Sequence, residues 1–167
     1  MTSVEIPSSV AAALPTLAVI TQTTLSLDDV AATVDVLADR FGDLRRPGAE
    51  DICYATQNRQ DAVKEIVGRG ATLLLVIGSP TSSNANRLVE VAEARGAEAT
   101  LIDGESPLDD ELLNGHLVIG LTAGASTPEG LVQAVLSGLS DRGYEDVEEI
   151  TVAREDVHFR LPREVYA

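Results

Sequence analysis

Apolar residues recur along the chain in two patterns, one typical of buried strands and one typical of helices. The strand pattern is clearest at 72–77 (TLLLVI), where no polar residue follows Thr72, as in a parallel strand covered on both faces. Shorter apolar runs predict further strands at 16–21, 99–102 and 117–120. The sequence therefore predicts an α/β fold, with a mainly parallel sheet and helices on both of its faces.

Between these strands, apolar residues spaced three and four apart predict helices. The first helical face consists of Val30, Val34, Leu37 and Phe41. Further helices are predicted from about residue 58 to 68, from about 85 to 96, and from about 128 to 139. Two helix starts carry capping signals, namely Ser26 followed by Asp29, and Thr127 followed by Pro128 and Glu129.

Two stretches fall outside this alternation. Residues 42–50, with Pro47 and Gly48, predict a loop that forms the internal boundary of the chain. Near the carboxyl terminus, apolar and polar residues alternate with a period of two at 157–161, which predicts an extended segment. Together with 147–152, this segment is interpreted as a terminal strand pair or an extended arm.

Composition limits the classes of function. The 167 residues suffice for one compact domain, and 44% of them are hydrophobic. The apolar runs are too short to cross a bilayer, and residues 1–15 lack the features of a signal peptide, which predicts a soluble cytoplasmic protein. The formal net charge of −15 argues against binding to nucleic acid or to an anionic membrane surface. Binding of a small anion is compatible with this net charge, because backbone N–H groups and hydroxyls bind an anion locally.

Hydroxyl and amide side chains gather where predicted strands meet predicted helices. These junctions are 21–26 (TQTTLS), 53–58 (CYATQN), 78–84 (GSPTSSN) and 120–127 (GLTAGAST). In a parallel sheet they lie at the carboxyl edge of the strands, where open α/β folds bind ligands and helix amino termini favour anions. Ser, Thr and Asn are also common in caps and turns, so each junction alone can be structural. Together they predict a shared polar pocket, although none matches a nucleotide-binding motif.

The single cysteine, Cys53, excludes an internal disulfide and any metal site built mainly of thiolates from this chain. On residue chemistry alone, Cys53 is either a small hydrophobic side chain or a ligating or reactive thiolate before a helix amino terminus. The two histidines, His116 and His158, are interpreted as structural or surface residues.

Several motifs occur in one order: TQTTLS followed by DD, DICYATQNRQDAV, GS…SSNANRLVEVA, LID and TAGASTPEGLVQ. In this order they resemble the second half of the LytB-family reductases, from about Ala18 to the proline near the end of the chain. The resemblance implies conversion of (E)-4-hydroxy-3-methylbut-2-enyl diphosphate into isopentenyl and dimethylallyl diphosphates.

The resemblance also implies a fold of three similar α/β units around a 4Fe-4S cluster, to which each unit contributes one cysteine. Cys53 matches the third of these ligands. Thr23 matches a threonine at the reacting end of the substrate, which makes it the catalytic candidate. The residues that match the diphosphate-binding positions of the family are Ser82, Ser83, Asn84 and Ser126.

A division of the chain follows from this resemblance. Residues 1–15 are expected to be a mobile amino-terminal extension, and 16–46 a strand–helix remnant of the preceding LytB unit. Residues 47–142 are expected to form one LytB-type α/β unit, and 143–167 a carboxyl-terminal strand or arm.

The departures from the family pattern are large. In complete members, the first half supplies two further cysteine ligands, histidines that bind the diphosphate, and a glutamate in the proton relay. Here Pro80-Thr81 also replaces the more usual Lys-Asn before the S-S-N motif. One thiolate cannot hold a cluster that needs three protein ligands, so the chain is not expected to catalyse alone.

Three hypotheses remain open. The first is a reductase component whose partner chain carries the amino-terminal half, with a ferredoxin- or flavodoxin-like protein as electron donor and an isoprenoid diphosphate as ligand. The second is a non-catalytic diphosphate-binding or regulatory module that has lost the cluster. The third is an inactive, truncated product.

Overall fold

The structure, a computed structural model, describes residues 17–42, 44–46 and 53–152. Its strands form two parallel sheets. In the smaller sheet β1 (Leu17–Ala18) pairs with β2 (Leu44–Arg45). The larger sheet has the order β4-β3-β5, from β4 (Glu98–Ile102), β3 (Leu73–Ile77) and β5 (Ile119–Ala123). The prediction of a mainly parallel α/β fold is confirmed.

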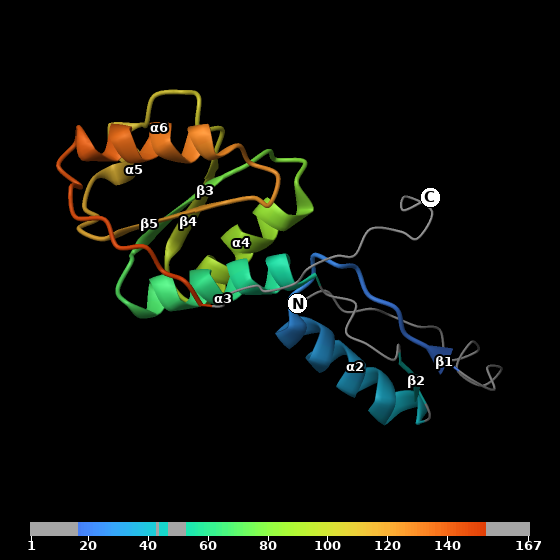
Figure 1. Ribbon diagram of the computed structural model, residues 1–167. Coiled ribbons are helices and arrows are strands. Elements are labelled where there is room, and N and C mark those ends of the chain that lie inside the picture. The colour runs from blue at the N-terminus through green and yellow to red at the C-terminus, as the bar shows by residue number, and fades with distance from the viewer. Residues whose placement is uncertain (1–16, 43, 47–52, 153–167) are drawn as a thin grey trace, which may run out of the picture.

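Helices cover both faces of the larger sheet. One face carries α3 (Tyr54–Gly68) and α4 (Ser83–Ala94), and the other carries the short α5 (Asp110–Leu113) and α6 (Glu129–Ser140). Figure 1 shows these layers, with α6 above the strands and α3 and α4 below them. The remaining helix, α2 (Leu27–Phe41), lies with β1 and β2 to one side of this core.

The central strand β3 divides the core into two apolar clusters. Its side chains point alternately to the two faces, and all five are at most 1% exposed. Leu74 and Val76 pack with residues of α3 and α4, whereas Leu73, Leu75 and Ile77 pack with residues of α5 and α6. The unbroken apolar run at 73–77 is thus explained by burial on both faces.

The order of the strands creates a topological switch point between β3 and β5. From the carboxyl end of β3, the chain passes to α4 on one face; from the carboxyl end of β5, it passes to α6 on the other face. Ligands of open α/β sheets bind in the crevice outside such strand ends. The loops 78–82 and 124–128 therefore hold the position at which this fold is expected to bind a ligand.

Several element boundaries differ from the predictions. The strand at 117–120 is shifted to 119–123, and α3 begins at Tyr54 rather than near residue 58. Ser26 does occupy the N-cap of α2, but its side chain makes no capping hydrogen bond. At α6 the N-cap is Pro128, and the hydroxyl of Thr127 donates to the carbonyl of Ile77 over 3.0 Å instead of capping the helix.

Two elements were not predicted at all. Within the expected loop 42–50, residues 44–45 form β2, and the polar stretch before β5 contains α5. Residues 147–152 form neither helix nor strand, so no strand is seen in this stretch, and the alternative of an extended arm stays a prediction. The expectations for 1–15 and 157–161 lie outside the described residues. Among the described helices, none is both long and apolar enough to cross a membrane.

Candidate functional site

The S-S-N motif begins α4 at the carboxyl end of β3. Ser82 is the N-cap, and its hydroxyl accepts a hydrogen bond of 3.3 Å from the backbone N–H of Ala85. Ser83 and Asn84 therefore lie in the first turn of the helix, where backbone N–H groups lack helical partners and the helix dipole favours an anion. The loop before them is bonded to α4, because the side-chain amide of Asn86 in this helix donates to the carbonyls of Pro80 and Ser82.

Asn84 is the most unusual polar side chain of the core. It is only 8% exposed, and among the described residues neither its amide oxygen nor its amide nitrogen has a hydrogen-bond partner. Leaving a buried polar group unpaired costs about 1–3 kcal/mol, so such groups are rare without a reason. Both amide atoms are covered in this structure, so the side chain must turn outward before it can donate to a ligand at this helix amino terminus.

The loop that carries Ser126 approaches the same helix from β5. The N–H of Gly124 donates to the carbonyl of Ile77 over 2.9 Å, which extends the contact between the two strands beyond their ends. A Cβ placed on Gly124 would lie 3.7 Å from the Cβ of Ala85, so this loop runs against the first turn of α4. Ser126 is exposed, and it lies at the same edge of the sheet as Ser82, Ser83 and Asn84.

A third loop reaches this edge from the amino-terminal part of the chain. The hydroxyl of Thr24 lies 3.0 Å from that of Ser83, and the amide of Gln22 donates to the same Ser83 hydroxyl over 3.3 Å. The exposed Thr23 contributes its carbonyl, which accepts a hydrogen bond of 3.2 Å from the N–H of Cys53. The structure therefore brings together the loops of Thr23, Cys53 and Ser83.

Sequence reasoning singled out Thr23 in this loop and missed its two neighbours. Gln22 and Thr24 make the side-chain contacts to Ser83, whereas the side chain of Thr23 is exposed. The signal was the run of hydroxyl and amide side chains in TQTT, which does not reveal which of them faces α4.

Cys53 is the N-cap of α3 and is exposed. It offers one thiolate donor at a helix amino terminus. Within the described part of the chain, no group of three or more His, Cys, Asp or Glu side chains is arranged to hold a metal ion. The donor set described here does not fit a 4Fe-4S cluster on its own, because such a cluster needs several protein ligands.

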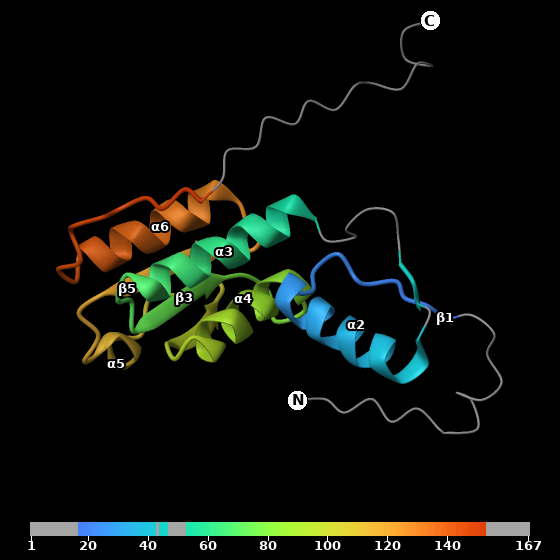
Figure 2. The same cartoon turned by 90° about the horizontal axis from the view of Figure 1, so that it is seen from below.

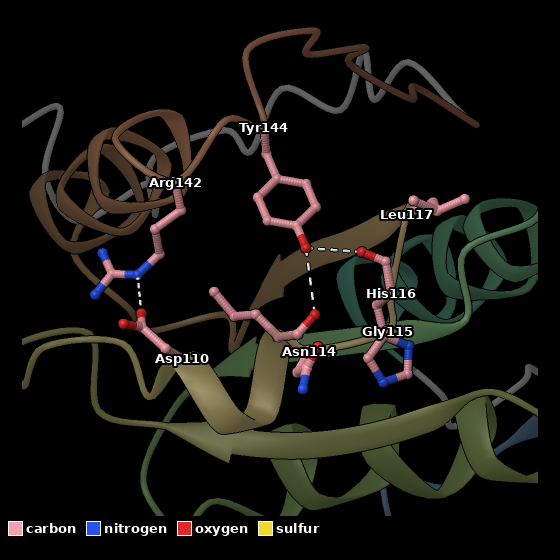
Figure 3. Close-up of a pocket in the computed structure, with 8 residues that line it drawn as sticks. Asp110, Asn114, Gly115, His116, Leu117, Arg142 and Tyr144 are labelled. Carbon is pink, nitrogen blue, oxygen red and sulfur yellow. Dashed lines mark hydrogen bonds and ion pairs between the residues drawn. The ribbon is translucent and has the colours of Figure 1, made fainter.

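An open hollow of about 460 Å³ lies at the opposite end of β5 and is distinct from this edge (Figure 3). Several of its polar groups have protein partners. Arg142 donates to Asp110 over 2.5 Å, and the hydroxyl of Tyr144 lies 2.7 Å from the carbonyl of His116. The ring of His116 lies 2.9 Å from the hydroxyl of Thr72, which supports a structural role for this histidine.

Comparison with known proteins identifies relatives along most of the chain. The family model described as LytB protein matches residues 2–140. The chain is 51% identical over 147 residues to the 4-hydroxy-3-methylbut-2-enyl diphosphate reductase of Alcanivorax borkumensis, covering 88% of this chain and 47% of that protein. The corresponding reductase of Streptomyces avermitilis is 50% identical over 147 residues, with 87% and 43% covered.

The fold has a solved counterpart as well. The E-1-hydroxy-2-methyl-but-2-enyl-4-diphosphate reductase from Plasmodium falciparum superposes with a TM-score of 0.80 at 32% identity, covering 93% of this chain and 51% of that one. The chain thus spans about half the length of the curated relatives it matches. The resemblance found in the motifs is confirmed; the family match begins ahead of Ala18 and ends at Ser140.

Proposed function

We propose that this chain, which belongs to the LytB protein family, forms the carboxyl-terminal part of a 4-hydroxy-3-methylbut-2-enyl diphosphate reductase and binds the diphosphate group of its substrate. Curated relatives of this name, at about 50% identity, support the proposal. In it, Thr23 lies at the reacting end of the substrate and Cys53 is one ligand of a 4Fe-4S cluster. The diphosphate is bound by Ser82, Ser83, Asn84 and Ser126.

The observation that carries this proposal is the unpartnered amide of Asn84. It is buried in the first turn of α4, at the switch point between β3 and β5. A diphosphate there would accept hydrogen bonds from the amide and from helix N–H groups, and it would lie at the positive end of the α4 dipole. These donors suit an anion even though the chain carries a net charge of −15.

The remaining parts of the reductase are proposed to come from a LytB amino-terminal half. One thiolate from Cys53 leaves the other cluster ligands to be supplied by that half. The active protein would then be a cytoplasmic oxidoreductase of the non-mevalonate isoprenoid pathway, with a ferredoxin- or flavodoxin-like electron donor.

A second candidate is a non-catalytic module that binds an isoprenoid diphosphate without a cluster. The single thiolate and the small donor set of the described residues favour it. Turnover after addition of a LytB amino-terminal half would exclude both this module and an inactive product, whereas retained diphosphate binding without turnover would favour the module.

Binding of inorganic pyrophosphate to the 167-residue chain tests the diphosphate site. We expect a Kd in the high-micromolar to millimolar range, about 4–6 kcal/mol of binding free energy, because only part of the site is present. Asn84→Ala and Ser126→Ala should each weaken binding about 10- to 100-fold, since each removes a hydrogen bond to a charged group worth about 1.5–3 kcal/mol. Calorimetry, or NMR titration of backbone amides, measures both effects.

Matched controls come from the same residue types away from this edge. Asn114, which lines the hollow at the opposite end of β5, and the exposed Ser137 on α6 should tolerate substitution by alanine without a change in Kd. If millimolar pyrophosphate leaves the amides of residues 82–84 and 126 unshifted, the proposed diphosphate site is wrong. Equal losses in Asn84→Ala and Asn114→Ala would also reject it.

A further inference from the structure

The first turn of α2 is attached to the core by charged side chains. Asp28 and Asp29 follow each other there, and they bind cations on two different helices. The Nζ of Lys64 on α3 lies 3.0 Å from a carboxylate oxygen of Asp28, and Arg87 on α4 pairs with Asp29. Neither apolar cluster of the core includes a described residue of α2. The ion pairs of Asp28 and Asp29 thus contribute to the placement of α2.

The geometry of a helix explains why two consecutive carboxylates can form ion pairs with two different helices. Neighbouring residues of an α-helix point about 100° apart, so one carboxylate can face α3 while the next faces α4. Beyond this turn α2 runs away from the core (Figures 1 and 2), so its attachment is concentrated at its amino-terminal end. Acidic residues in the first turn also interact favourably with the dipole of α2.

Each cation is held in place by a second carboxylate on its own helix. Lys64 also pairs with Asp61, three residues earlier, over 3.2 Å, and Arg87 also pairs with Glu90, three residues later. The two cationic side chains are only 23% and 18% exposed, so their heads have little freedom. Each cation is thus shared between a carboxylate of its own helix and one of α2.

Shifts in pKa agree with an ionised pair. A hydrogen bond from Lys64, together with its charge, lowers the pKa of Asp28. Partial burial tends to lower the pKa of Lys64, but hydrogen bonds to Asp28 and Asp61 outweigh it, and the pKa of this lysine is raised. Both partners are therefore charged at neutral pH.

We propose that Lys64 and Arg87 are positioning residues: with Asp28 and Asp29 they form a latch that holds the loop 22–26 over the amino terminus of α4. The loop immediately precedes the two aspartates, and hydrogen bonds connect it to the core. Gln22 and Thr24 contact Ser83, the N–H of Cys53 donates to the carbonyl of Thr23, and the amide of Gln60 donates to the carbonyl of Leu25. Breaking these ion pairs should increase the motion of the loop at its carboxyl-terminal end, next to Asp28 and Asp29. Only the benefit to ligand binding rests on the proposed function; the latch itself does not.

Hydrogen exchange of the Cys53 backbone amide reports on the latch, because this N–H is bonded to the carbonyl of Thr23. In the 167-residue chain at low salt, without phosphate, Asp29→Asn and Arg87→Gln should each speed this exchange about two- to fivefold, as expected for a partly exposed ion pair. The double variant should exchange no faster than either single variant, since both remove the same pair. Arg87→Lys, which keeps the charge, should exchange at close to the wild-type rate.

A control on another ion pair separates the latch from general effects of charge. Arg69→Gln removes the pairs with Glu65 and Glu148 at the carboxyl end of α3 and should leave Cys53 exchange unchanged. Amide shifts of residues 73–77 should stay constant in every variant, which confirms an intact core. Unchanged Cys53 exchange in Arg87→Gln, or additive effects in the double variant, overturns the latch.

The affinity for pyrophosphate is measured on the same variants as an independent readout. We expect Arg87→Gln to weaken binding about two- to fivefold, and Arg87→Lys to restore it, because the loop contributes Gln22 and Thr24 to the edge at Ser83. If the wild-type chain does not bind pyrophosphate, the proposed function fails, while the exchange measurements still decide whether the latch exists.

Discussion

Replacing Cys53 with serine is expected to abolish reductase turnover in a complex of this chain with a LytB amino-terminal half. A serine hydroxyl does not replace a thiolate as an iron ligand, so the cluster would lose one of its protein ligands. The exposed position of Cys53 at the N-cap of α3 means that the same change should leave the stability of the chain almost unaltered. These effects are measured on the wild-type chain and the Cys53→Ser variant. The measurements are turnover with an artificial electron donor, iron content, and thermal unfolding.

The chain alone is the control for this result. Purified without oxygen and supplied with iron and sulfide, it should hold no stoichiometric four-iron cluster and show no turnover, because it contains a single cysteine. Its oligomeric state is measured alongside, since symmetric copies could share one cluster. A four-iron cluster on the monomer, or full turnover of the Cys53→Ser complex, would contradict the assignment of Cys53 as one of several required ligands.

The sheet and the edge that carries the candidate site were predictable because they depend on local patterns. The apolar run at 73–77 indicates a strand buried on both faces, and hydroxyl-rich junctions follow the strand ends. In a parallel sheet these two facts place the loops of Ser83 and Ser126 at one edge. No distant contact had to be known for that prediction.

Other features depend on contacts between residues far apart in sequence, and these were missed. The two-residue strand β2 exists only through its pairing with β1, which lies before α2. The partners of Asp28 and Asp29 likewise cannot be read from their own helix, because Lys64 and Arg87 lie on two later helices. For Ser26 the local pattern predicted a contact that does not form. The residue occupies the N-cap of α2, yet its buried side chain makes no capping hydrogen bond.

Substituting Gly78 with alanine should both destabilise the fold and disturb the proposed diphosphate site. A Cβ at this position would lie only 2.6 Å from the Cβ of Ala85, which is fixed in the first turn of α4. The end of β3 and the start of α4 must then move apart, at a cost of about 1–3 kcal/mol, as is usual for overpacking in a core. The same movement displaces Ser83 and Asn84, so pyrophosphate binding should weaken as well.

Gly130→Ala is the matched control, and its expected effect has the opposite sign. This glycine lies within α6, where an added Cβ meets no atom within 4 Å. Alanine is the better helix former, so urea denaturation should show a stability that is unchanged or higher by up to about 1 kcal/mol. If Gly78→Ala instead matches Gly130→Ala in both stability and pyrophosphate affinity, close contact between β3 and α4 does not position the S-S-N motif, and the site must be held by the surrounding loops.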